Sequence, residues 1–209
     1  MRKLFASLLF CISSLWSFEQ SVDLLDTSNF WRYGVAGTVL TAYGTNVMGA
    51  DEAAFEYGMT ETGMNGEEVD VFKLIFKWDK KVLVSKGRFT LDWYWMLDIG
   101  RFEQRDVQVG DGANDALGIT PTFRYAYEYS SWKPYFEIGV GPYLIAHTDY
   151  IGRDLTTHFQ FGDFVTFGFY VGERKQWNIA YKFFHHSNGE IKHPNNGIGM
   201  ELFSVGYRY

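Results

Sequence analysis

The chain lacks several of the features on which other protein classes depend. Of its 209 residues only one is a cysteine, Cys11, and it lies close to the N-terminus. The rest of the chain therefore has neither a disulfide framework nor thiol chemistry. No apolar run approaches the roughly eighteen residues that a membrane-spanning helix needs. The formal net charge of −6 argues against a nucleic-acid-binding surface.

The N-terminal segment has the features of a secretory signal peptide. Two basic residues precede an apolar run that ends near Leu15, and this run is too short to span a membrane. We expect a signal peptide at residues 1–17, with cleavage after Ser17, and a mature domain at 18–209. An exported chain without disulfides or long helices can contact a membrane only through β-structure.

What the sequence does contain is many aromatic residues, 19% of the chain, at a mean hydropathy of only −0.18. They follow a period of two, as in FTLDWYWMLDI, where large apolar residues alternate with residues such as Asp92 and Asp98. The same alternation predicts eight strands, at 34–44, 71–78, 89–99, 119–129, 133–141, 159–171, 177–187 and 198–209.

These strands predict an all-β fold, an eight-stranded antiparallel transmembrane β-barrel in the outer membrane. A soluble barrel or sandwich would also alternate. The signal peptide, the aromatic apolar face and the alternation up to a terminal aromatic, Tyr209, favour the membrane barrel. Expected connections are long at 45–68, 102–116, 146–157 and 188–197, and shorter at 79–87, 130–132 and 172–176. With the N-terminus in the periplasm, the long connections are extracellular, and the acidic first one is expected to be a solvated loop.

One polar cluster, in FFHHSN, interrupts the apolar pattern near the end of the seventh expected strand. Alternation places His185 and Ser187 on the outward, lipid-facing side and His186 and Asn188 on the inward side. A histidine two residues from a serine on one face can act as general base and activate the hydroxyl as a nucleophile. A metal site of His185, His186 and His193 is disfavoured because the first two alternate faces, so we expect neither metal nor cofactor.

A catalytic triad also needs a carboxylate that fixes the tautomer of the imidazole. Two acids break the apolar pattern on the outward face of neighbouring strands, Asp163 and Glu201. Asp163 falls opposite His185 if the turn between the sixth and seventh strands is centred near Arg174. An ionised group that faces lipid is costly unless it has a partner or lies at the interface.

The stretch HHSN (185–188), followed by PNNGI (194–198), resembles the H-x-S-N…P-N-x-G signature of the PagL-type lipid A 3-O-deacylases. The resemblance covers about residues 68–209 and includes TPTFRYAYEY, KPYFEIGVG and FQFGDF. The family implies an outer-membrane barrel with a Ser-His-Glu triad on its lipid-facing surface. It hydrolyses the acyl ester at the 3-position of lipid A in the outer leaflet and releases a 3-hydroxy fatty acid.

The resemblance implies roles for individual residues. Ser187 would be the nucleophile and His185 the general base. Asn195 would match the asparagine proposed for the oxyanion hole, helped by a backbone N–H of the turn that begins at Asn188. Phe161 falls on a further family position and is expected to contact the substrate, which is lipid A of lipopolysaccharide.

The sequence departs from the family at Gly199, where the family has its glutamate. Glu201 lies two residues further along the same strand face and is the preferred acid. Asp163 is the alternative, and a triad that has lost its acid is a third reading.

Two functions of other kinds fit the same residues. The chain could be a non-catalytic small barrel with surface-binding loops, in which HHSN is only the end of a strand. It could also be an outer-membrane phospholipase or acyltransferase that uses the same serine and histidine. A homodimer in the membrane is compatible with the sequence.

Overall fold

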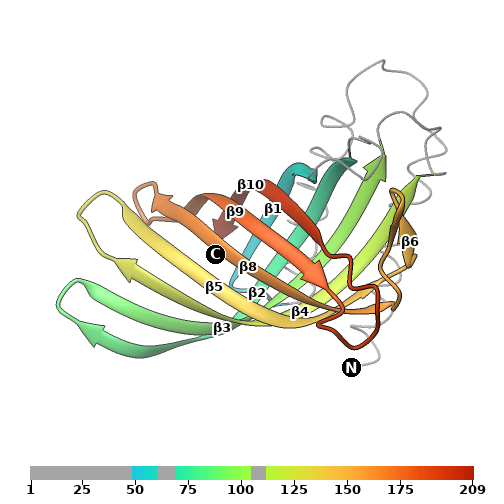
Figure 1. Cartoon of the computed structure of the whole chain (residues 1–209). Coiled ribbons are helices and arrows are strands. Elements are labelled where there is room, and N and C mark those ends of the chain that lie inside the picture. The colour runs from blue at the N-terminus through green and yellow to red at the C-terminus, as the bar shows by residue number, and fades with distance from the viewer. Residues whose placement is uncertain (1–48, 61–68, 105–111) are drawn as a thin grey trace, which may run out of the picture.

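The computed structural model describes residues 49–60, 69–104 and 112–209, which form a closed antiparallel barrel of eight strands (Figure 1). The predicted signal peptide (1–17) and the first predicted strand (34–44) lie outside these ranges. In the described ranges, no helix is long and apolar enough to cross a membrane. The barrel strands are β1 (Glu52–Thr60), β2 (Val69–Lys86), β3 (Phe89–Gln104), β4 (Ala113–Tyr127), β5 (Lys133–Ile145), β8 (Phe159–Val171), β9 (Trp177–Ser187) and β10 (Ile198–Arg208).

Each barrel strand pairs with its neighbours in the sequence, and β1 pairs with β10 to close the sheet. Closure leaves no unpaired sheet edge at β1 or β10. The remaining strands of the described chain, β6 (Asp149–Tyr150) and β7 (Arg153–Asp154), pair with each other within the β5–β8 connection. Among the described connections, those at one barrel end are long, at 146–158 and 188–197, whereas those at the other end, such as 87–88 and 172–176, are short. This asymmetry agrees with the predicted one.

The prediction of a solvated acidic loop at 45–68 is wrong for residues 52–60, which form β1. The acidic residues of this segment point into the barrel rather than into solvent. Glu52 accepts a hydrogen bond from Lys77 at 2.9 Å, and Glu56 pairs with Lys182. The acidic character of the segment therefore reflects the inward face of a strand whose counter-charges lie on other strands.

The predicted loop at 79–87 is also wrong, because β2 continues as far as Lys86 and meets β3 in a tight turn. Gly87 has a φ of 60° in this turn, a conformation that glycine adopts without strain. The register between β2 and β3 shifts twice, beyond Trp78 and beyond Val82. These irregularities interrupt the period of two, which is why alternation did not predict the second half of the strand.

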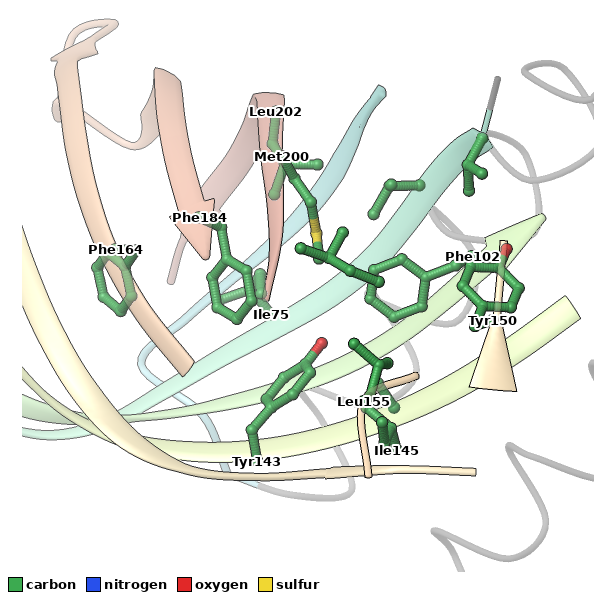
Figure 2. Packing of buried hydrophobic residues seen from close by; sticks show 14 of the residues in the cluster. Ile75, Phe102, Tyr143, Ile145, Tyr150, Leu155, Phe164, Phe184, Met200 and Leu202 are labelled. Atoms are coloured by element: carbon green, nitrogen blue, oxygen red, sulfur yellow. The ribbon is translucent and has the colours of Figure 1, made fainter. Parts of the chain in front are cut away.

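Side chains on the inner face fill the barrel near the end with the long connections. Figure 2 shows the rings of Phe102, Tyr143, Phe164 and Phe184 converging with aliphatic side chains of β2, β5 and β10. Most residues of this cluster are almost inaccessible to solvent. The barrel interior at this level is thus a packed core, and it contacts the inner face of β8, β9 and β10.

Candidate active site

The last residues of β9 divide between the two faces of the barrel wall. The side chain of His185 points outward and is 46% exposed, whereas His186 points inward and is 1% exposed. Ser187 lies on the outward face, and Asn188 is buried. The predicted division into an outward His–Ser pair and an inward His–Asn pair is confirmed.

Asp163 lies directly across from His185 in the register of β8 and β9, as predicted. Its carboxylate Oδ1 is 3.1 Å from Nδ1 of the imidazole. Both side chains are on the outward face and about half exposed. This contact occupies Nδ1 and leaves Nε2 available for another group.

Nε2 of His185 lies against β10, on the other side of β9 from Asp163. A Cβ atom at Gly197 would lie 2.2 Å from Nε2, so only glycine leaves room for the ring. The register pairs Ile198 with His186, and continuing it by one residue places Gly197 across from Ser187. The imidazole therefore spans from the carboxylate on β8 to a point beside β10 at the level of Ser187.

Glu201 contacts a different residue. It lies across from Phe183 on β9, not across from His185, and its carboxylate accepts a hydrogen bond from the hydroxyl of Tyr181. The residue of β10 across from His185 is Gly199. The two outward-facing acids thus have separate partners.

Asn195 and Asn188 hold the connection between β9 and β10. The backbone N–H of Asn188 donates to Oδ1 of Asn195 at 3.0 Å, and Nδ2 of Asn195 donates to Glu190 at 3.2 Å. The buried side chain of Asn188 donates to Thr156 Oγ1 at 2.6 Å and to the carbonyl of Lys192 at 2.7 Å. The Asn188 side chain therefore connects two loops instead of facing the outward site.

The β5–β8 connection lies beside the connection between β9 and β10 (Figure 1). Arg153 donates a hydrogen bond of 2.7 Å to the carbonyl of Gly197, next to the imidazole, and Asn196 donates one of 3.3 Å to the carbonyl of Asp154. Sequence reasoning missed Arg153 and Thr156. No local pattern points to them, because their partners lie 44 and 32 residues away along the chain.

The aromatic ring of Phe161 lies on the β8 side of Ser187, the candidate nucleophile. Phe161 lies across from Ser187 in the register and is 37% exposed. Its ring covers Gly189, where a Cβ atom would be only 2.8 Å from the ring, and it packs edge-on against Phe159 at 5.2 Å.

His193 lies in the same connection but contributes to no histidine cluster. Its Nε2 is 3.4 Å from Glu190, and both side chains are strongly exposed. Among the residues that the structure describes, no group of three or more His, Cys, Asp or Glu side chains is arranged to hold a metal ion.

Several known proteins are similar to this chain. A family model described as lipid A 3-O-deacylase (PagL) matches residues 71–208. Lipid A deacylase PagL of Pseudomonas aeruginosa is 27% identical over 164 residues, which is 78% of this chain and 89% of that protein. Lipid A deacylase PagL of Bordetella bronchiseptica is 28% identical over 89 residues, 43% of this chain and 47% of that protein.

A solved structure shares the fold. The crystal structure of the outer membrane enzyme PagL superimposes with a TM-score of 0.62 at 20% identity, covering 76% of this chain and 99% of that one. The barrel is thus of the outer-membrane type. Because the family model spans well over half of the sequence, the chain belongs to the lipid A 3-O-deacylase (PagL) family.

Proposed function

We propose that this chain is a serine esterase that hydrolyses the acyl ester at the 3-position of lipid A in the outer leaflet. The observation that carries the proposal is the position of His185. Its imidazole contacts a carboxylate through Nδ1 and presents Nε2 at the level of Ser187, on a surface where lipid is the neighbour. This is the order of groups that a serine nucleophile requires.

The proposed reaction proceeds in two steps. Nε2 of His185 accepts the proton of Ser187 as Oγ attacks the ester carbonyl, and the resulting imidazolium then gives this proton to the departing sugar oxygen. Water, deprotonated by the same imidazole, next attacks the acyl-enzyme. Its hydrolysis releases the fatty acid and returns the proton to Ser187.

Asp163 is our choice for the acid that orients His185, in place of the Glu201 preferred from the sequence. The distance of 3.1 Å to Nδ1 supports Asp163, and the hydrogen bond from Tyr181 gives Glu201 a different partner. Strand β9 has a neighbour on each side. The resemblance places the family's glutamate at Gly199 on β10, whereas here the carboxylate comes from β8.

Asn195 is the proposed oxyanion donor. Its side-chain amide has two N–H bonds, and one of them is directed to Glu190. The second is free for the developing negative charge on the ester oxygen. The bond from the Asn188 N–H to Oδ1 of Asn195 fixes which way the amide points.

Expression of the wild-type chain and of Ser187→Ala in cells with unmodified lipid A tests the proposal. Mass spectrometry of lipid A is expected to show loss of one 3-linked acyl chain with the wild type and its retention with the variant. Phospholipid composition, measured in the same extracts, should not change. Release of phospholipid acyl chains instead would favour the phospholipase reading, and unmodified lipids with a correctly inserted wild-type barrel would favour the non-catalytic one.

A further inference from the structure

The Tyr181–Glu201 pair takes no part in the proposed reaction, and the reaction does not explain why a carboxylate lies at this position. Both side chains are exposed on the lipid-facing side, in the middle of β9 and in β10. A carboxylate that faces the apolar part of a bilayer is costly, and one phenol hydroxyl satisfies only part of its hydrogen-bonding capacity. A polar pair at this unfavourable position is explained if it contributes to substrate binding.

The geometry of His185 fixes the side of β9 on which an ester can react. Nε2 lies beside β10, over Gly197, whereas the β8 side is occupied by Asp163 and by the ring of Phe161. The carbonyl carbon must therefore sit at the seam between β9 and β10.

From this seam the acyl chain must run toward the bilayer centre, which is the direction from Ser187 to Tyr181 along β9. On β10 this path crosses Gly197 and Gly199, which have no side chains, and then reaches Glu201. Glu201 is four residues beyond Gly197 (197 to 201), or roughly 13 Å along an extended strand.

We propose that the Tyr181–Glu201 pair ends the path of the acyl chain and makes the enzyme prefer medium-length chains of about ten carbons, the length that spans roughly 13 Å. This inference rests on the proposed esterase function and adds its acyl-chain preference. Methylene groups beyond the pair's position must lie on a carboxylate and a hydroxyl, which are poorer neighbours for a hydrocarbon than the lipid they leave.

Strand β8 offers a matched control position. Val165 lies across from Phe183 on one side of β9, and Glu201 lies across from the same residue on the other side. A polar side chain at 165 therefore stands at the same depth, but away from the seam where the ester reacts. Val165→Gln tests depth alone, whereas the double variant Tyr181→Phe/Glu201→Val removes the pair without leaving an unpaired hydroxyl.

The experiment uses the purified full-length barrels in mixed micelles with lipid A species that differ only in the 3-linked chain, of about ten, twelve and fourteen carbons. The wild type is expected to favour the shortest over the longest by about tenfold in kcat/KM. The double variant should lose this preference and keep its rate on the shortest chain. Val165→Gln should keep the wild-type preference.

Several results would overturn the inference. A wild type that releases all chain lengths equally, or a double variant with an unchanged profile, removes the pair from chain selection while the esterase proposal stands. An altered oligomeric state with an unchanged profile assigns the pair to a protein interface. Loss of all hydrolysis in Glu201→Gln makes Glu201 the acid instead. If the wild type releases no chain from any lipid A, the esterase proposal itself fails.

Discussion

The two ring nitrogens of His185 lie toward different strands: Nδ1 contacts Asp163 on β8, and Nε2 lies over Gly197 beside β10. Strand alternation was enough to predict that His185 and Ser187 face outward, and a turn near Arg174 was enough to place Asp163 opposite His185. The partner of Glu201 could not be predicted, because it depends on the side-chain conformations of Tyr181 and Glu201. A period of two fixes faces, not rotamers.

The choice between the two acids can be measured directly. Asp163→Asn should reduce kcat on lipid A by roughly 10²- to 10⁴-fold, because an amide cannot hold the imidazole in the tautomer that accepts the serine proton. Glu201→Gln should stay within about tenfold of the wild type on its preferred substrate. The measurement is the rate of 3-hydroxy acid release by each purified variant, and the reverse order of effects would return the role to Glu201.

A second prediction at the scale of single residues concerns Gly197. Gly197→Ala adds a methyl group 2.2 Å from Nε2 of His185, so the ring must move. A displacement of about 1 Å at a reacting group can lower the rate by about 100-fold, and we expect a loss of that size in kcat with little change in thermal stability.

Gly100→Ala is the matched control for this substitution. The added methyl group there would meet the hydroxyl of Tyr143 at 3.2 Å, a contact that a small shift relieves, and it is remote from the outward site. Equal activity loss in the two variants would mean that crowding at Gly197 does not act through the imidazole.

At the scale of elements, the strands that the sequence predicted are those with one apolar face and regular pairing, such as β8 and β9. The strand it missed, β1, has outward Phe55 and Tyr57 but carries Glu52 and Glu56 on its inner face. Its charges resemble those of a solvated loop until their partners on β2 and β9 are known. Ion pairs between strands distant in sequence leave no local pattern.

The connections around the site should behave as one element. Asn188→Ala removes the bonds from the buried amide to Thr156 and Lys192, at an expected loss of about 1–3 kcal/mol because two hydrogen bonds of a buried side chain are lost. We expect a lower midpoint of thermal unfolding in detergent. We also expect about tenfold lower activity, because the connection that carries Asn195, the proposed oxyanion donor, loses support. Asn196→Ala, which removes one longer bond at a more accessible position, should change both little.

The short connections at the other barrel end include a pH-dependent contact. Burial alone would raise the pKa of Glu128, but hydrogen bonds and positive charge from Lys175 and Lys133 outweigh it and hold the pKa below its usual value. A lowered carboxyl pKa adds stability above the unfolded value of about 4.3, which is lost as pH falls through the folded value. Glu128→Gln should lower the midpoint of thermal unfolding slightly at neutral pH, and this difference should vanish in acid.

At the scale of the whole molecule, the barrel interior combines aromatic packing with buried ion pairs. Lys73 and Asp98 lie 3.0 Å apart with side chains that are at most 1% exposed, and the ammonium also lies 3.2 Å from the ring centre of Phe184. Asp98→Leu should lower the free energy of unfolding by about 3–5 kcal/mol, because it leaves a buried cation without its counter-charge.

The double variant Lys73→Met/Asp98→Leu should recover most of this loss, because apolar side chains can replace a buried ion pair at little cost. Urea unfolding of the three barrels in the same detergent measures both effects. A double variant as unstable as the single one would mean that the pair supports the barrel through the positions of its neighbours.

In the proposed site His185 and Ser187 face the lipid, and this direction determines which concentration of substrate governs the rate. A site that opens to lipid meets its substrate by lateral diffusion, so the rate depends on the fraction of the leaflet that is lipid A and not on its amount per volume of solution. Diluting lipid A with phospholipid in the same vesicles should therefore slow hydrolysis in proportion, while adding buffer should leave the rate per enzyme unchanged. Cells could then control the activity by changing the composition of the leaflet alone.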